Sequence, residues 1–265
     1  MSQSQTIVLI TGKSYHFQDE FQFNDLAGAN SGIGLAAAGV IASASDKYHV
    51  LVASRNVENA KTAVDEIKST FTVKGTISTI QLDVNDDNSI QNAAKEVEQQ
   101  YGHLDVLVNN AGVAGVKVDR ETIIKVLTTN CAGPVLVSEA FKPLLLKAKN
   151  PYSIYVSSGL GSFALRSKPG PWYDTPYDVY SMSKSALNMW ALQESKWMKK
   201  QGLKVFILCP GLVVSNLRGK SEEQRQAGGM AGSPIVSGET ILSIMEGKRD
   251  ADLGKFVHKD GVYDW

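Results

Sequence analysis

A tyrosine and a lysine four residues apart, Tyr180 and Lys184, are well placed in this sequence to do chemistry together. On a helix, positions i and i+4 share one face, so the phenol and the ammonium can converge on one ligand. A free phenol has a pKa of about 10, which is too high for easy proton exchange near neutrality. A nearby ammonium stabilises the phenolate and lowers that pKa. Tyr177 lacks this partner, because Ser181 stands at its i+4 position.

A glycine-rich run, Gly28-Ala29-Asn30-Ser31-Gly32-Ile33-Gly34, lies directly before a segment of good helix-forming residues. Glycines let a backbone approach a pyrophosphate closely, and the N–H groups and dipole of a helix N-terminus favour negative charge. The run therefore predicts a dinucleotide site. The strand-like run that should lead into it ends at Thr11-Gly12, sixteen residues before Gly28.

The segment Lys13–Gly28 separates that strand from the glycine run and has three interpretations. It is a surface excursion that leaves Gly28 as the first glycine, or a functional element that occludes or reshapes the site, or a retained intron. The third is favoured: Gly12-Lys13-Ser14 can be encoded by a stretch containing the splice signal GTAAGT, Ala27-Gly28 can carry a terminal AG, and removing sixteen codons keeps the frame. Four aromatic side chains in so short a polar segment would also need burial; they are Tyr15, Phe17, Phe21 and Phe23.

The residue after the second strand-like run indicates which dinucleotide binds. Sites for NAD usually place a carboxylate there, about 20 residues after the glycine loop, to bind the ribose 2′-hydroxyl. This chain has Ser54 and then Arg55. A guanidinium can pair with a 2′-phosphate through charge-assisted hydrogen bonds. We therefore expect NADP(H); the alternative is that Arg55 is a solvated residue at a helix start.

Short apolar runs alternate with helical patterns along the chain. Near-continuous Val, Ile and Leu runs are typical of parallel strands covered by helices on both faces. The runs are Thr6–Thr11, His49–Ser54, Ile77–Leu82, Leu104–Asn109, Tyr152–Ser157 and Lys204–Cys209. The segments Val57–Phe71 and Ser89–Tyr101 carry a 3.6-residue periodicity between them. This alternation predicts a single α/β domain over residues 1–265, a doubly wound Rossmann fold.

Several motifs together resemble those of the short-chain dehydrogenase/reductase family, and of its carbonyl-reductase-like, fungal-type branch. Without Lys13–Gly28, the first loop would have the family pattern T-G-x-x-x-G-x-G. Asn109-Asn110-Ala111-Gly112 matches the family's N-N-A-G signature, and Tyr180 to Lys184 matches its Y-x-x-x-K motif. The resemblance covers nearly the whole chain from Thr6 to Trp265, apart from the insert.

The resemblance implies a role for each matched residue. Ser158 would polarise the substrate carbonyl, Lys184 would also bind the nicotinamide ribose, and Asn130 would support a water that links Lys184 to solvent. Asp83 and Val84 would border the adenine, and Pro210-Gly211 would frame the nicotinamide. The implied catalytic residues are Ser158, Tyr180, Lys184 and Asn130. The implied cofactor contacts are Gly12, Gly28, Asn30, Ser31, Gly32, Ile33, Gly34, Arg55, Asp83, Val84, Asn110, Ala111, Gly112, Tyr180, Lys184, Pro210, Gly211, Val213 and Ser215.

Two further segments are expected to shape a substrate site. Residues 217–234 are rich in Gly, Ser, Gln and charge, which is typical of a mobile substrate loop or lid. The stretch between Ser158 and Tyr180 is either an apolar substrate wall or a packed surface loop; its apolar residues are Phe163, Leu165, Pro169, Pro171, Trp172 and Tyr173. The tail from Gly254 to Trp265 is expected to add a final strand and an aromatic anchor. The expected substrate is a small, apolar carbonyl or alcohol compound.

Composition restricts the remaining possibilities. The formal net charge is zero, which argues against nucleic acid or an anionic membrane as a partner. The four histidines have no metal-ligand spacing, and Cys131 and Cys209 are expected to be buried free thiols, so no metal site is predicted. We expect a cytoplasmic protein, monomeric or homo-oligomeric. A catalytically silent dinucleotide-binding protein, or an inactive product of a mis-spliced gene, remains the alternative because the glycine loop is interrupted.

Overall fold

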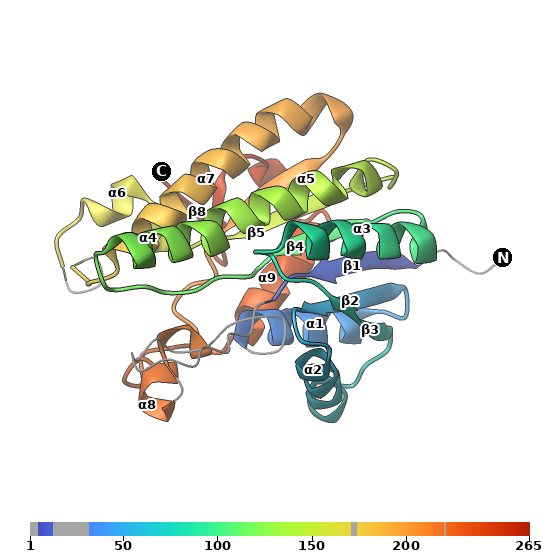
Figure 1. Cartoon of the computed structure of the whole chain (residues 1–265), viewed down its shortest axis with the longest axis horizontal. Helices are drawn as coiled ribbons and strands as arrows, with labels where there is room; N and C mark the ends of the chain where they lie inside the picture. The colour runs from blue at the N-terminus through green and yellow to red at the C-terminus, as the bar shows by residue number, and fades with distance from the viewer. Residues whose placement is uncertain (1–4, 13–31, 171–173, 220) are drawn as a thin grey trace.

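Eight strands form one sheet in the computed structural model, which describes residues 5–12, 32–170, 174–219 and 221–265. The strand order is β3-β2-β1-β4-β5-β6-β7-β8, and helices cover both faces of the sheet (Figure 1). The predicted doubly wound α/β fold is therefore confirmed. The segment Lys13–Gly28 lies outside the described residues.

The strands agree with the six predicted runs to within two residues at each end. They are β1 (Thr6–Ile10), β2 (Tyr48–Ser54), β3 (Thr76–Gln81), β4 (Val106–Asn109), β5 (Tyr152–Val156), β6 (Lys204–Leu208), β7 (Phe256–His258) and β8 (Gly261–Tyr263). Seven are parallel, and β8 pairs antiparallel with β7. The expectation of one final strand was wrong, because a two-residue turn folds the tail into a hairpin, which can only be antiparallel.

Each face of the sheet buries its own apolar cluster. Helices α1 (Gly32–Ala44), α2 (Val57–Thr70) and α9 (Ile235–Met245) cover one face, and α3 (Asp87–Tyr101), α4 (Arg120–Leu127), α5 (Gly133–Leu145) and α7 (Asp178–Met198) cover the other (Figure 1). Along β4, Val106 and Val108 belong to the first cluster and Leu107 to the second, because alternate side chains of a strand point to opposite faces. No helix within the described ranges is both long and apolar enough to cross a membrane.

The strand order reverses beside β1, which pairs with β2 on one side and with β4 on the other. Ligands of such sheets bind in the crevice outside the carboxyl ends of the strands at this switch point. Here Thr11 links the carboxyl end of β1 to the residues that follow β4. Its hydroxyl accepts hydrogen bonds from the backbone N–H of Asn110 at 3.0 Å and of Ala111 at 3.3 Å, and its carbonyl accepts one from Asn110 Nδ2 at 3.0 Å.

A buried polar network fixes α7, which carries Tyr180 and Lys184, to β5 and α5. Glu194 of α7 is fully buried. Its carboxylate accepts hydrogen bonds from Tyr155 Oη at 2.6 Å and from Ser138 Oγ at 3.3 Å, and Lys142 Nζ is 3.3 Å away. Trp190 Nε1 donates to Tyr155 Oη at 3.2 Å. The network satisfies polar groups from three elements inside the second apolar cluster.

We expect Glu194→Gln to lower the free energy of unfolding by about 2 kcal/mol, because it removes the charge that faces Lys142 and weakens two buried hydrogen bonds. Denaturant unfolding measures this. The matched control is Glu96→Gln, at an exposed glutamate that accepts only a surface hydrogen bond from Gln100, and it should change stability by less than about 0.5 kcal/mol. Equal effects of the two changes would contradict the structural role of the network.

Candidate active site

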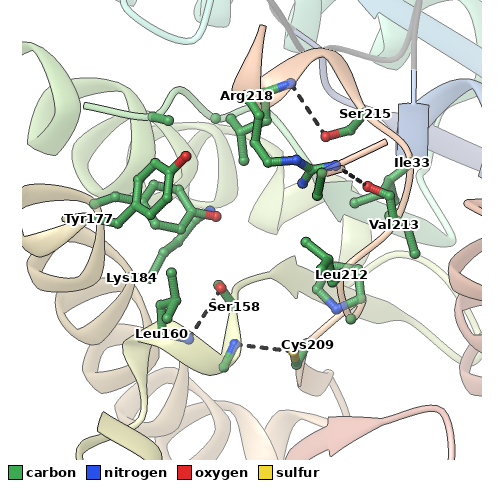
Figure 2. Close-up of a pocket in the computed structure, with 18 of the residues that line it drawn as sticks. Ile33, Ser158, Leu160, Tyr177, Lys184, Cys209, Leu212, Val213, Ser215 and Arg218 are labelled. Carbon is green, nitrogen blue, oxygen red and sulfur yellow. Dashed lines mark hydrogen bonds between the residues drawn. The ribbon is translucent and has the colours of Figure 1, made fainter. Parts of the chain in front are cut away.

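A cavity of about 930 Å³ opens at the carboxyl ends of β4, β5 and β6 (Figure 2). Each of these strand exits contributes lining residues, and α7 and the first turn of α1 add others. Among the predicted site residues, those that line the cavity are Ile33, Asn110, Gly112, Ser158, Tyr180, Lys184, Pro210, Gly211, Val213 and Ser215. The parallel sheet thus brings residues more than 180 positions apart in sequence into one site.

Tyr180 is only 7% exposed, and Ser158 lies beside its phenol in the cavity. The Ser158 hydroxyl accepts a hydrogen bond from the backbone N–H of Leu160 at 3.2 Å. Burial raises the pKa of Tyr180; the Ser158 hydroxyl and the charge of Arg218 oppose that rise, while Cys209 and Tyr177 add to it. The expectation that Lys184 and a cationic nicotinamide together lower this pKa stays a prediction; in the protein without cofactor, burial outweighs every other effect on the phenol.

Lys184 is 3% exposed and lies on the same face of α7 as Tyr180. Its Nζ donates a hydrogen bond to the backbone carbonyl of Val156 at 2.9 Å and is 5.8 Å from the centre of the Tyr180 ring. Burial lowers the pKa of Lys184 to about 8, so its amine exchanges protons near neutral pH. The lysine therefore contacts the end of β5 rather than the phenol directly.

Asn130 lies in a π-helical turn, η1 (Thr128–Ala132), between α4 and α5. Such turns are rare and are frequent at functional sites. The Asn130 side chain accepts a hydrogen bond from the N–H of Val113 at 2.8 Å and donates to the Val113 carbonyl at 2.8 Å and to Ser183 Oγ at 3.0 Å. Ser183 in turn donates to the carbonyl of Tyr180 at 2.7 Å. The buried amide thus ties the exit of β4 to α7, a role that the sequence did not indicate.

The first turn of α1 lies against the loop after β6. Gly32 has a φ of +55°, and a Cβ atom placed there would lie 3.2 Å from Cβ of Ser215. A left-handed backbone and this close approach both favour glycine at the position. Gly12 and Gly34, which lie on either side of Lys13–Gly28 in the sequence, are both buried. The predicted contacts Gly28, Asn30 and Ser31 lie outside the described residues.

Comparison with known proteins gives the family. The family model described as short chain dehydrogenase matches residues 26–226. The chain is 34% identical to the short-chain dehydrogenase/reductase eupG of Phoma sp, over 91% of this chain and 96% of that protein, and 31% identical to tropE of Talaromyces stipitatus, over 89% and 94%. The chain belongs to the short-chain dehydrogenase/reductase family. It is therefore an oxidoreductase that acts on alcohol and carbonyl groups.

The fold agrees with solved structures of the family. An NADPH-bound carbonyl reductase from chicken fatty liver superposes with a TM-score of 0.76, at 24% identity, over 99% of both chains. The family match begins at residue 26, so it leaves out β1 and most of Lys13–Gly28. The strand β1 is nevertheless hydrogen-bonded at the centre of the sheet, where a short-chain dehydrogenase/reductase needs its first strand.

The residues predicted to bind the adenine half do not line the described cavity. Arg55 follows β2 and is half-buried, and its carbonyl accepts a hydrogen bond from Gln81 Nε2 at 3.4 Å. Asp83 follows β3, where its carboxylate accepts a hydrogen bond from the N–H of Asn85 at 3.0 Å, as in an Asx turn. Val84 is buried, and its carbonyl would be 2.7 Å from a Cβ atom at Gly133. These residues share the carboxyl edge of the sheet with the cavity.

Several residues that line the cavity were not predicted from the sequence to belong to the site. Tyr177, although it has no lysine at i+4, lines the cavity beside Tyr180, with ring centres 6.4 Å apart. Arg218 and Tyr263 also line it, and they come from the loop after β6 and from the terminal hairpin. Of the residues before Tyr180, Leu165 lines the cavity and Phe163 is 74% exposed; Pro171, Trp172 and Tyr173 lie outside the described residues. Leu165 therefore belongs to the cavity wall, whereas Phe163 lies on the surface.

The predicted substrate loop covers one side of the cavity. Within residues 217–234, α8 (Glu222–Arg225) begins with a capping box between Ser221 and Gln224. A bridge between Val213 and Gly232 closes the base of the loop. Leu217, Arg218, Gln224, Ala227, Gly228 and Met230 of this loop face the cavity. The segment is thus more regular than its composition suggested.

No group of three or more His, Cys, Asp or Glu side chains that could hold a metal ion occurs in the described part of the chain. Cys131 and Cys209 are free thiols, half-buried and buried respectively. Cys209 Sγ accepts a hydrogen bond from the N–H of Gly159 at 3.1 Å, and burial raises the pKa of this thiol.

We expect Lys184→Met to stabilise the protein without cofactor by about 2 kcal/mol at pH 7. An unfolded lysine has a pKa near 10.5 and the folded one about 8, so burying its charge costs about 3 kcal/mol below pH 8, offset in part by the bond to Val156. Because the lowered pKa means that the unfolded state binds more protons, this cost falls as pH rises from 8 to 10.5. The advantage of the variant should shrink over the same range.

Denaturant unfolding at pH 7, 8, 9 and 10 measures this effect. Lys147→Met is the matched control, at a half-exposed lysine paired with Glu98, and its stability difference from the native chain should stay constant with pH in this range. A Lys184→Met difference that does not change between pH 7 and pH 10 would contradict the lowered pKa.

Proposed function

We propose that the chain is an NADP(H)-dependent oxidoreductase that reduces the carbonyl group of a small, mainly apolar substrate, or oxidises the corresponding alcohol. The observation that carries this proposal is the convergence of Ser158, Tyr180 and Lys184 on one cavity, where the Ser158 hydroxyl lies near enough to the Tyr180 phenol to act on its pKa. Two hydroxyls that converge in an apolar pocket can bind one carbonyl oxygen. The family supports the reaction class.

The described residues fit a nicotinamide dinucleotide. The first turn of α1 contains no carboxylate that would repel a pyrophosphate, and Gly32 allows close approach of the backbone. Asn110, Gly112, Pro210 and Gly211 would hold the nicotinamide end, since they line the cavity next to Lys184. The chicken carbonyl reductase, which shares the fold, contains NADPH. When bound, the cofactor supplies the hydride that reduces the carbonyl carbon.

The side chains of the chain would then orient the substrate and supply the proton. Ser158 and Tyr180 donate hydrogen bonds to the carbonyl oxygen, and the Tyr180 proton moves to that oxygen as the alcohol forms. Because burial raises the pKa of Tyr180, the phenol stays protonated at neutral pH, which is the form that reduction requires. Lys184 places a positive charge near the phenolate that remains. Asn130 keeps α7 in register with the exit of β4.

We expect Tyr180→Phe to lower kcat for carbonyl reduction by about 1,000-fold or more while NADPH binds within about threefold of the native affinity, because only the proton donor is lost. Steady-state NADPH oxidation and an NADPH fluorescence titration measure the two quantities. Tyr177→Phe is the matched control, and it should retain far more turnover. Full turnover by Tyr180→Phe would refute the assignment of the proton donor.

We expect Arg55→Asp to reverse the preference for NADPH over NADH, since a carboxylate repels the 2′-phosphate and can accept a hydrogen bond from a 2′-hydroxyl. The ratio of the two dissociation constants should change by about 100-fold. Titration of native and variant protein with both cofactors gives this ratio. An unchanged ratio would mean that Arg55 is only a solvated residue at the start of α2.

A second candidate is a protein that binds the dinucleotide without catalysis, which the interrupted glycine loop favours. The NADPH titration and a screen of carbonyl compounds separate the two. Binding with carbonyl-dependent NADPH oxidation supports the reductase, and binding without any turnover supports the silent protein. A folded 265-residue chain that does not bind NADPH would mean that Lys13–Gly28 destroys the site.

A further inference from the structure

Asn188 continues the row of side chains that Tyr180 and Lys184 begin on α7. The three residues repeat at intervals of four, so they lie on one face of the helix. Asn188 is 3% exposed, and its side chain contacts the segment Ser157–Gly161, called here the Ser158 turn. One helical face therefore carries two residues that line the cavity and a third that contacts the turn next to them.

Both ends of the Asn188 amide are used, and they bind on either side of Ser158. Its Oδ1 accepts a hydrogen bond from Ser157 Oγ at 2.5 Å, and its Nδ2 donates one to the carbonyl of Gly161 at 3.1 Å. Ser157 directly precedes Ser158, and Gly161 ends the short helical turn η2 (Gly159–Gly161) that follows it. The two ends of the Ser158 turn are thus tied to one buried amide.

The Ser158 turn also packs closely on the backbone of α7. A Cβ atom at Gly161 would lie 2.8 Å from the carbonyl carbon of Lys184 and 2.9 Å from its Cβ. Ser185 Oγ donates a second hydrogen bond to the Gly161 carbonyl at 3.0 Å. Because packing this close leaves little room for movement, the contacts at Gly161 fix the position of the turn along α7.

Within the turn, the orientation of Ser158 is set by its neighbours. Its hydroxyl accepts a hydrogen bond from the N–H of Leu160 at 3.2 Å, a contact that uses a lone pair of the oxygen and not its proton (Figure 2). The N–H of Gly161 donates to the Ser158 carbonyl at 2.8 Å. The direction of the hydroxyl therefore follows the position of the turn, which depends on Asn188.

We propose that Asn188, with Ser157, is a positioning residue for the reaction: it holds the Ser158 turn against α7 so that the Ser158 and Tyr180 hydroxyls meet on one carbonyl oxygen. This inference rests on the proposed function, because the reacting carbonyl must lie between those two hydroxyls. Stabilisation of the charge that develops on the oxygen depends steeply on where the donor lies, so a small displacement of the turn should lower the rate by a large factor.

The test asks whether Asn188 acts through Ser158, with NADPH as reductant and 4-nitrobenzaldehyde as the carbonyl compound. Rates are expressed per NADPH-binding site, counted by fluorescence titration, so that a loss of folded protein does not lower them. We expect Asn188→Leu to lower kcat by about 10- to 100-fold, while the affinity for NADPH stays within about threefold of native.

The same change in a Ser158→Ala background should lower kcat by less than about threefold, because the hydroxyl that Asn188 positions is absent there. Equal factors in the two backgrounds would overturn the inference and would mean that Asn188 only stabilises the fold.

Ser157→Ala is a milder variant that tests the same contact if Asn188→Leu does not fold. It removes the hydrogen bond to Asn188 Oδ1 and should lower kcat by about 3- to 10-fold. Ser195→Ala is the matched control, because Ser195 is also buried and its hydroxyl donates to the carbonyl of Leu192 at 2.9 Å, seven residues beyond Asn188 on the same helix. Its kcat should remain native, and a fall equal to that of Ser157→Ala would overturn the inference.

Hydrogen exchange gives a second measurement that needs no substrate. The N–H groups of Gly161 and Ser162 donate to the carbonyls of Ser158 and Gly159. In Asn188→Leu their exchange should be faster by about 10-fold or more, with that of β4 unchanged, and native rates in the turn would overturn the inference. If the native chain reduces no carbonyl compound, the proposed function is overturned, and exchange alone still decides whether Asn188 holds the turn.

Discussion

The attachment of α7 to β5 at two points is the constraint on which the site depends. At one end Lys184 donates to the carbonyl of Val156, and at the other Glu194 accepts from Tyr155, both residues of β5. Because the two contacts lie ten residues apart on one helix, they fix both its axial position and its rotation. This position of α7 places Tyr180 beside Ser158, which lies two residues after the end of β5. A helix thus places the Tyr180 hydroxyl, and the residues that directly follow a central strand place that of Ser158.

Burial gives these groups opposite changes in proton affinity. The pKa of the Tyr180 phenol is raised and that of the Lys184 ammonium is lowered to about 8, with desolvation as the main cause in each case. Both changes favour the uncharged forms, so the pocket by itself resists the ion pair that a tyrosine and a lysine would form in a polar setting. Arg218 is the described cation whose charge opposes the rise in the pKa of Tyr180, but burial outweighs its effect.

The sequence predicted what depends on local pattern and missed what depends on tertiary contacts. Apolar runs located six strands, and the spacing of Tyr180 and Lys184 placed both on one helical face. The burial that raises the pKa of Tyr180 in the protein without cofactor could not be predicted from the sequence, because burial is a property of the packed molecule. The hydrogen-bond partners of Asn130 and Arg218 could not be predicted for the same reason: residues such as Ser183 and Gln224 reach them through the way helices and loops pack.

Contacts described elsewhere in the fold hold the two elements that flank Lys13–Gly28, the segment that the sequence predicts to be an insert. Thr11 is bound to Asn110 and Ala111, and α1 packs on α9, where a Cβ atom at Gly238 would be 3.0 Å from the α1 backbone. These contacts involve no residue of Lys13–Gly28. With the insert, 19 residues separate Gly12 from Gly32, against 3 without it, and loop-closure entropy puts the cost of that extension at roughly 2 kcal/mol. A domain whose core comes from two large apolar clusters can bear a cost of this size, so its consequences concern the phosphate end of the site more than the fold.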